Sequence, residues 1–387
     1  MRASYKNSIQ RRLGVLGLGT SPGLSFSNQI VRTAARAVPF SDKTRWTGLA
    51  YIHMHEYARE IKQQEQEKID LLQFTALTLV IRTLRRARTH HRHSREILLI
   101  TRVPRMKDIY AQFQKDGYVI LEDFFQPEEI EELRACGEEF TNKLPPESER
   151  KVFSTIQYPQ NKDKYFLDST NKISVFFESE ALEEDGKLKV HPRVSLNKVG
   201  HALHWLHPTF KKFTFDERVK EIAFQLNYEE PMVCQSMYIY KNPGIGSEVT
   251  MHQDASYLYV EPMKLVGFWI ALEDATLENG CLWIAPGSHQ SGTHRRYMRN
   301  KDSNSQELLI FDRPAPCYPL SNFRPVPVRK GTCILIHGQV VHFSYPNKSE
   351  TSRHTYIFHV IETKHVLYSK ENWLQPPAEG FASFYKN

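Results

Sequence analysis

The C-terminal part of this 387-residue chain, from about residue 231 onward, is a succession of short β-type runs separated by turn signals. The runs are Met232–Tyr240, Leu265–Leu272, Cys281–Ala285, Thr332–Ile336 and Thr355–Ile361. Turn-forming pairs such as Asn279-Gly280 and Lys330-Gly331 stand between them. Many short strands with no helix between them favour an antiparallel sandwich or barrel over a parallel α/β sheet.

The segment before these runs predicts helices. Residues 107–116 have apolar side chains at helical spacing, and Gly117 stands where a helix commonly ends. Tyr118–Phe125 is rich in β-forming residues and predicts a strand. Pro127 then begins a second helix, which we expect to stop at Pro145. The fold class expected is therefore α+β, mainly β, with helices flanking the strands on their N-terminal side.

Charge divides the chain into two parts. Residues 1–105 contain 19 basic and 7 acidic residues, whereas residues 106–387 contain 32 and 37. We therefore expect a basic N-terminal extension over 1–105, poorly ordered or helical, followed by one folded domain over 106–387. No acidic residue precedes Asp42, a composition typical of a mitochondrial transit peptide, with an unstructured basic tail as the alternative.

Two stretches of the extension bear on its partners. The basic run Arg82–Arg95 has no interleaved aromatic residue, and single-strand binders normally add aromatic stacking to such charge. We expect a solvated helix or a disordered segment there, and no nucleic-acid partner. The apolar stretch Leu71–Ile81 is shorter than the roughly 20 residues that cross a bilayer, so no transmembrane segment is expected.

The five cysteines are odd in number and far apart, which excludes a zinc ribbon and a dense disulfide framework. Reduced thiols favour an intracellular location, the cytoplasm first and the mitochondrion as the alternative. We expect a monomer.

A candidate metal site lies within the strand-rich half. His252 and Asp254 are two residues apart, and side chains at i and i+2 of an extended segment point to the same face. His342, near the end of another β-rich stretch, is the third candidate ligand. Two imidazoles and one carboxylate are the facial triad of non-haem Fe(II) oxygenases, whereas zinc more often takes cysteines or three histidines. The His-x-Asp spacing alone is weak, because the chain contains 17 histidines.

Other residues extend or compete with this set. Arg353 follows His342 by one predicted strand, and a guanidinium there could hold the remote carboxylate of a dicarboxylic co-substrate. His337 is the alternative to His342; on one continuous strand the two would face opposite ways, although Gly338 permits a turn between them. His289 follows a Pro-Gly-Ser turn and is expected to be structural.

These residues carry a resemblance to a known family. The segment from Gly267 to His289, with Asn279-Gly280 and Pro286-Gly287-Ser288-His289, is similar to the signature of the phytanoyl-CoA dioxygenase family. The order His252-x-Asp254, His342-x-Ser344, Arg353 also resembles that family. The resemblance runs from about Met106 to the C-terminus, and the extension has no counterpart in it.

The resemblance implies a double-stranded β-helix, or jelly roll, that binds Fe(II) and 2-oxoglutarate. It implies His252, Asp254 and His342 as iron ligands, and Arg353 as the partner of the C5 carboxylate. Further co-substrate contacts implied by it are at Lys198, Met237, Trp269 and, as an addition, Ser344. From the residues alone, Trp269 and Met237 fit ordinary core packing equally well, and Lys198 fits a surface amine.

The implied reaction converts 2-oxoglutarate and O2 to succinate and CO2, coupled to hydroxylation of a small-molecule substrate, with ascorbate as an optional reductant. The family's founding chemistry acts on acyl-CoA, but fold and cofactor do not transfer substrate identity. The alternative function is a non-catalytic jelly-roll binding protein with a vestigial or zinc-filled site.

Overall fold

The structure of the chain is a computed structural model that describes residues 106–385. The expectations for the extension, including the basic run Arg82–Arg95 and the apolar stretch Leu71–Ile81, lie outside the described residues. Within the described range, no helix is both long enough and apolar enough to cross a membrane.

All the described helices precede β4, but the strands β1, β2 and β3 lie among them in the sequence. The helices are α5 (Met106–Asp116), α6 (Pro127–Thr141), α7 (Lys164–Leu167), α8 (Leu203–Leu206), α9 (Pro208–Thr214) and α10 (Glu217–Gln225). The first eight strands are β1 (Tyr118–Leu121), β2 (Ile173–Phe177), β3 (Leu196–His201), β4 (Pro231–Ile239), β5 (Val249–His252), β6 (Val260–Glu261), β7 (Leu265–Ala271) and β8 (Leu282–Ile284). The others are β9 (Tyr297–Arg299), β10 (Leu309–Phe311), β11 (Arg324–Val326), β12 (Cys333–His337), β13 (His342–Ser344), β14 (Thr355–Glu362), β15 (Leu367–Tyr368) and β16 (Ala382–Ser383).

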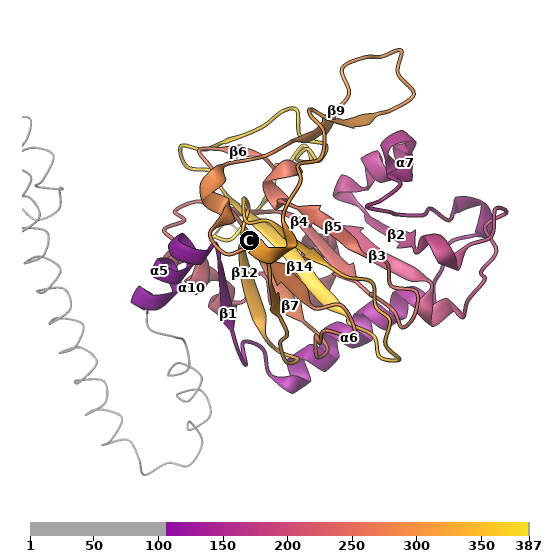
Figure 1. Cartoon of the computed structure of the whole chain (residues 1–387), viewed down its shortest axis with the longest axis horizontal. Helices are drawn as coiled ribbons and strands as arrows, with labels where there is room; N and C mark the ends of the chain where they lie inside the picture. Colours follow the sequence, from indigo (N-terminus) through magenta and orange to yellow (C-terminus); the bar gives the residue numbers. More distant parts are fainter. Residues whose placement is uncertain (1–105, 386–387) are drawn as a thin grey trace, which may run out of the picture. The chain divides into compact units, whose positions relative to one another are not determined.

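Two antiparallel sheets form the body of the domain. The large sheet has the order β1-β12-β7-β14-β4-β3-β2, with β16 pairing β4 at its side. The smaller sheet has the order β11-β8-β13-β5. Neighbouring strands are mostly distant in the sequence, which is the crossed connectivity of a jelly roll. The structure thus has the predicted fold class: mainly β, with flanking helices (Figure 1).

The helices pack on one face of the large sheet, and the alternation of side chains along each strand decides what faces them. Phe268 of β7 and Phe358 of β14 stack at 4.8 Å between ring centroids in the main core, together with side chains of α5, α6, α9 and α10. The residues that alternate with the core residues along each strand point to the other face. Trp269 of β7 and Ile334 of β12 are examples, and both pack with β8 of the smaller sheet. That second face encloses the candidate site.

The first predicted strand is shorter than its sequence suggests. β1 ends at Leu121, whereas the pattern predicts a strand to Phe125. Asp123 has a φ of 51°, a left-handed conformation that breaks the extended backbone. The aromatic rings at 124 and 125 still enter or border the main core, so the apolar pattern reports burial there without a strand.

Candidate metal centre and its cavity

Strands of the smaller sheet bring the three candidate ligands together. β5 ends at His252, extended backbone at Gln253 follows, and Asp254 begins a 3₁₀ turn. β13 begins at His342, which pairs in register with His252. The sequence places His252 and Asp254 on one face because they are two residues apart in extended chain, and the strand pairing adds the third side chain.

The three side chains form the one group in the described part of the chain that the structure arranges to hold a metal ion. Their ligand atoms all lie within 4.8 Å of one another. Oδ1 of Asp254 is 3.6 Å from Nε2 of His252 and 3.7 Å from Nε2 of His342. All three side chains are buried or half-buried.

Backbone carbonyls fix which nitrogen of each histidine is free. Nδ1 of His252 lies 2.8 Å from the carbonyl oxygen of Thr250, and Nδ1 of His342 lies 3.1 Å from that of Val340. A carbonyl only accepts, so Nδ1 carries the proton in both rings and Nε2 presents its lone pair. Burial, and then the neighbouring His252, lower the pKa of His342 to about 4, which keeps this imidazole neutral at pH 7. Two imidazoles that each present Nε2, together with a carboxylate, fit a divalent ion.

A histidine of the large sheet also contacts the carboxylate of Asp254. Nε2 of His359, on β14, lies 3.3 Å from Oδ2 of Asp254. Burial raises the pKa of Asp254, but His359 and His342 outweigh it and hold the pKa well below its ordinary value. The carboxylate is therefore ionised, with one oxygen facing the two ligand histidines and the other facing His359.

Arg353 lies in the same cavity, buried to 2 % exposure. Its Nη1 donates to Oγ1 of Thr355 at 3.1 Å, and its guanidinium lies 5.4 Å from the ring centroid of Trp269. Among the residues that the structure describes, its Nε has no hydrogen-bond partner and no carboxylate pairs with the side chain. Burial lowers the pKa of Arg353 to about 10, so the group remains a cation at pH 7. A buried cation with an unused donor fits a carboxylate ligand.

Lys198 is the second buried cation of the cavity. It lies on β3 with 7 % exposure, and its Nζ sits 3.0 Å from the ring centroid of Phe153. Within residues 106–385 no hydrogen bond or ion pair engages its ammonium, and its burial shows that the surface-amine alternative is wrong. Burial lowers the pKa of Lys198 well below its ordinary value, and Glu178 opposes the shift. An anion entering the cavity would restore the charge.

The remaining candidate residues also line this cavity, which has a volume of about 150 Å³. Met237 on β4, Trp269 on β7 and Ser344 on β13 all reach it. Met237 alternates with Tyr238, which points into the main core on the opposite face. The structure thus brings every candidate residue to one cavity.

The two competing histidines lie elsewhere. β12 ends at His337, a turn follows, and β13 begins at His342, so the two are not on one continuous strand. The ring of His337 packs 4.9 Å from that of His289, and Nε2 of His289 bonds to the carbonyl oxygen of Gln114 at 3.0 Å. His289 therefore joins the smaller sheet's turn to helix α5 and is structural, as expected.

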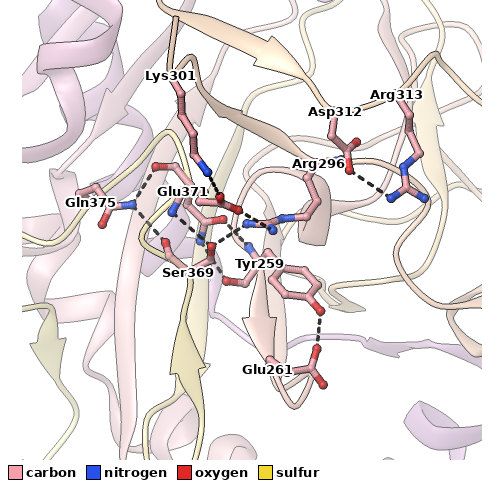
Figure 2. Close-up of polar contacts among 10 residues, drawn as sticks. Tyr259, Glu261, Arg296, Lys301, Asp312, Arg313, Ser369, Glu371 and Gln375 are labelled. Carbon is pink, nitrogen blue, oxygen red and sulfur yellow. Dashed lines mark hydrogen bonds and ion pairs between the residues drawn. The ribbon is translucent and has the colours of Figure 1, made fainter.

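The hairpin of β9 and β10 and the C-terminal segment form another part of the cavity wall. Arg296, beside β9, pairs with Glu371 at 3.1 Å and donates to Ser369 at 2.6 Å, and Lys301 reaches the same Glu371 (Figure 2). These contacts fasten β9 to the segment that carries Trp373. Because Tyr297 of β9 and Trp373 both line the cavity, the ion pairs fix two of its aromatic walls in place.

The sequence analysis did not identify two residues of the cavity, His359 and His201. His359 lies two residues beyond Ile357 on the inward face of β14, so strand alternation from Thr355 could have found it. His201 ends β3, three residues after Lys198, but no spacing signal ties it to the metal ligands.

Comparison with known proteins identifies the family. The family model described as "Phytanoyl-CoA dioxygenase (PhyH)" matches residues 113–355. The chain belongs to the phytanoyl-CoA dioxygenase family. It is 44% identical over 263 residues to an Arabidopsis thaliana phytanoyl-CoA dioxygenase, covering 68% of this chain and 91% of the relative. It is also 44% identical over 290 residues to a Caenorhabditis elegans homologue of phytanoyl-CoA dioxygenase domain-containing protein 1, covering 73% and 100%.

Membership in the phytanoyl-CoA dioxygenase family indicates a 2-oxoglutarate-dependent non-haem iron oxygenase, in agreement with the predicted cofactors. More distant likenesses occur among solved structures. One is the non-heme alpha ketoglutarate dependent carbocyclase SnoK from nogalamycin biosynthesis (20% identity, TM-score 0.46, covering 68% of this chain and 87% of that one). Another is EctD from S. alaskensis with 2-oxoglutarate and 5-hydroxyectoine (18% identity, TM-score 0.46, covering 67% and 77%).

Proposed function

We propose that this chain is an Fe(II)- and 2-oxoglutarate-dependent dioxygenase that hydroxylates a small molecule. The observation that carries the proposal is the convergence of His252, Asp254 and His342 in one cavity with a buried, unpaired Arg353. Ferrous iron with 2-oxoglutarate supplies oxidative decarboxylation to succinate and CO2, coupled to hydroxylation of a C–H bond by O2.

The protein's first task is to present three ligand atoms in a fixed arrangement. Thr250 and Val340 hold the rings of His252 and His342 through their carbonyl oxygens, so that Nε2 of each ring is free for the ion. His359 holds the second oxygen of Asp254, which leaves Oδ1 for the same ion. These three contacts limit rotation of all three ligand side chains.

Its second task is to hold the co-substrate. Arg353 is placed to bind the C5 carboxylate of 2-oxoglutarate, with Thr355 fixing one edge of the guanidinium. Lys198 supplies a second positive charge in the same cavity, and the flanking surfaces of Met237 and Trp269 exclude water from it. We assign Ser344 to the same co-substrate pocket, where its buried hydroxyl is available to an oxygen ligand.

A substrate screen tests the proposal. The chain, supplied with Fe(II), 2-oxoglutarate and ascorbate, is incubated with metabolite pools, and substrate-linked succinate is measured. We expect at least one small molecule to stimulate succinate release, and His252→Ala to abolish it. Release at the wild-type rate from that variant would remove His252 from the ligand set.

The competing function is a non-catalytic jelly-roll binding protein. Such a protein would bind metal and ligand but release no succinate with any compound. The unpaired Arg353 beside a complete ligand set favours the enzyme, because a vestigial site has no need of a buried cation without a counter-ion.

A further inference from the structure

His201, at the end of β3, is completely buried inside a ring of aromatic side chains. Its ring centroid lies 5.5 Å from that of Phe166, 5.7 Å from Phe176 and 5.0 Å from Trp373. Trp373 in turn stacks on Phe166 at 4.5 Å. Nothing in the metal and co-substrate roles proposed above uses this imidazole, although it lines the same cavity.

Hydrogen bonding fixes which nitrogen of His201 carries the proton. Oγ of Ser169 lies 2.6 Å from the carbonyl oxygen of Phe166 and 2.8 Å from Nδ1 of His201. A serine hydroxyl has one proton, and the carbonyl can only accept, so Ser169 donates to Phe166. Oγ must then accept from His201, which places that ring's proton on Nδ1. Nε2 is left as a bare acceptor.

No group in the described part of the chain satisfies that acceptor. Nε2 of His201 is buried and has no hydrogen-bond partner. Burial, and then the neighbouring Lys198 and His359, lower the pKa of His201 well below its ordinary value, so the ring stays neutral. An unsatisfied buried acceptor is unfavourable, and a ligand that donates a hydrogen bond to it removes that cost.

Aromatic side chains also make up part of the lining of the cavity that His201 borders. Phe153, Tyr257, Tyr297 and Trp373 line the cavity, and the ion pairs at Glu371 hold the last two walls together. Two of the three cations that line the cavity, Lys198 and Arg353, are already assigned to the co-substrate, and the third, Lys241, donates to the carbonyl oxygens of Ser247 and Tyr345. The aromatic part of the cavity therefore offers a substrate apolar surface beside the unpartnered Nε2 of His201.

We propose that His201 determines substrate specificity, by accepting a hydrogen bond through Nε2 from the hydroxyl or N–H group of an uncharged, largely aromatic or apolar substrate. The inference rests on the proposed function, because it assigns the substrate side of that same site. A pocket that hydrogen-bonds a donor discriminates strongly against analogues that lack it, since the buried acceptor is then left unpaired.

Indole and indene are the probes that test this role, because they have nearly the same shape and only indole carries an N–H donor. The full chain, loaded with Mn(II) and 2-oxoglutarate, is titrated with each probe by ligand-observed NMR. We expect indole to bind about fivefold or more tightly than indene, the ratio that one hydrogen bond supplies. A pocket that offers only apolar contact would bind indene more tightly, because indole would lose the hydration of its N–H group without a replacement hydrogen bond.

Two variants test whether His201 causes the preference for indole over indene. His201→Phe keeps an aromatic ring and removes the acceptor, so its indole-to-indene ratio should fall to about one or below. His204→Phe is the matched control: His204 is equally buried, but its Nδ1 bonds to Ser236 and it does not line the cavity. This control should keep the wild-type ratio.

Each other result counts against the proposal. Equal binding of the two probes to the wild-type chain, tighter binding of indene, or binding of neither overturns it, whether or not the variants fold. Survival of the indole preference in His201→Phe overturns it as well. Failure of the chain to bind Mn(II) and 2-oxoglutarate would instead contradict the proposed function, and the probe comparison would still be made on the metal-free chain.

Discussion

His359 of β14 reaches across Gly267 of β7 to Asp254: its Nε2 lies 3.3 Å from Oδ2 of the carboxylate. The strand register places His359 directly opposite Gly267. A Cβ added at Gly267 would lie 3.2 Å from that Oδ2 and 3.4 Å from Nε2 of His359. The missing side chain at Gly267 therefore provides the space in which the large sheet contacts a candidate ligand of the smaller one.

The contact predicts that His359 sets metal affinity without binding the metal itself. His359→Leu removes the donor and leaves Oδ2 of Asp254 unpaired, so we expect the dissociation constant for Mn(II) to rise about 10- to 100-fold. His359→Gln, which can still donate an N–H, should lose less. Mn(II) binding is measured by electron paramagnetic resonance, and equal affinities for wild type and Leu variant would contradict the role.

Gly267→Ala should weaken the same site by crowding. The added methyl forces the carboxylate or the imidazole to move by a few tenths of an ångström, and we expect about a tenfold loss of Mn(II) affinity. Gly200→Ala on β3 is the control, because its nearest neighbour at 3.2 Å is the flexible side chain of Met237. A Gly267 variant that binds Mn(II) like the Gly200 control would show that the close approach is unimportant.

Arg353→Lys should separate co-substrate binding from metal binding. A lysine keeps the charge but cannot offer two parallel donors to a carboxylate, so we expect the dissociation constant for 2-oxoglutarate to rise about tenfold or more. Mn(II) affinity should stay within about twofold of wild type. Calorimetric titration measures both. Arg134→Lys, on α6, serves as the control, since Arg134 pairs with Glu273 and does not line the cavity.

Acid should destabilise the metal-free chain through its buried histidines. Burial lowers the pKa of His204 from 6.5 to about 3, so between these values the unfolded chain binds a proton that the folded chain does not. The free energy of unfolding then falls as pH decreases below 6.5, by up to about 1.4 kcal/mol per pH unit for this group. The free energy of unfolding is measured by urea titration at several pH values between 7 and 4, and it should decrease less steeply with falling pH in His204→Phe than in the wild type. An unchanged pH dependence would exclude His204 as a source of the acid destabilisation.

Short-range patterns were sufficient for much of the fold and for part of the site. Runs of β-forming residues bounded by turn signals located β4, β7 and β14 to within a residue or two, and the i, i+2 spacing placed His252 and Asp254 on one face. The pairing of His342 with His252 depends on strand register across a long sequence separation, which no local spacing predicts. The sequence offered His342 as the third candidate with His337 as the alternative, and the family resemblance favoured His342.

The residues that sequence reasoning missed depend on contacts between segments that are far apart in the sequence. His359 acts on Asp254 through the space above Gly267, and no local spacing records a contact between strands of different sheets. The tautomer of His201 follows from Ser169 and Phe166, which are far from it in the sequence. Both features require coordinates.

The extension can be tested separately. Relatives of this family are covered almost end to end by about 70% of this chain, for example 100% of the Caenorhabditis elegans homologue by 73%. We therefore expect a chain that begins at Met106 to keep full 2-oxoglutarate turnover. Loss of turnover on deletion of residues 1–105 would assign the extension a part in catalysis.

Anaerobic titration with Fe(II) in the presence of 2-oxoglutarate tests the central claim most directly. The wild-type chain should bind one Fe(II) per chain together with one 2-oxoglutarate, and His252→Ala, Asp254→Ala and His342→Ala should each lose both. Iron and 2-oxoglutarate binding that survives unchanged in these three variants would contradict the account.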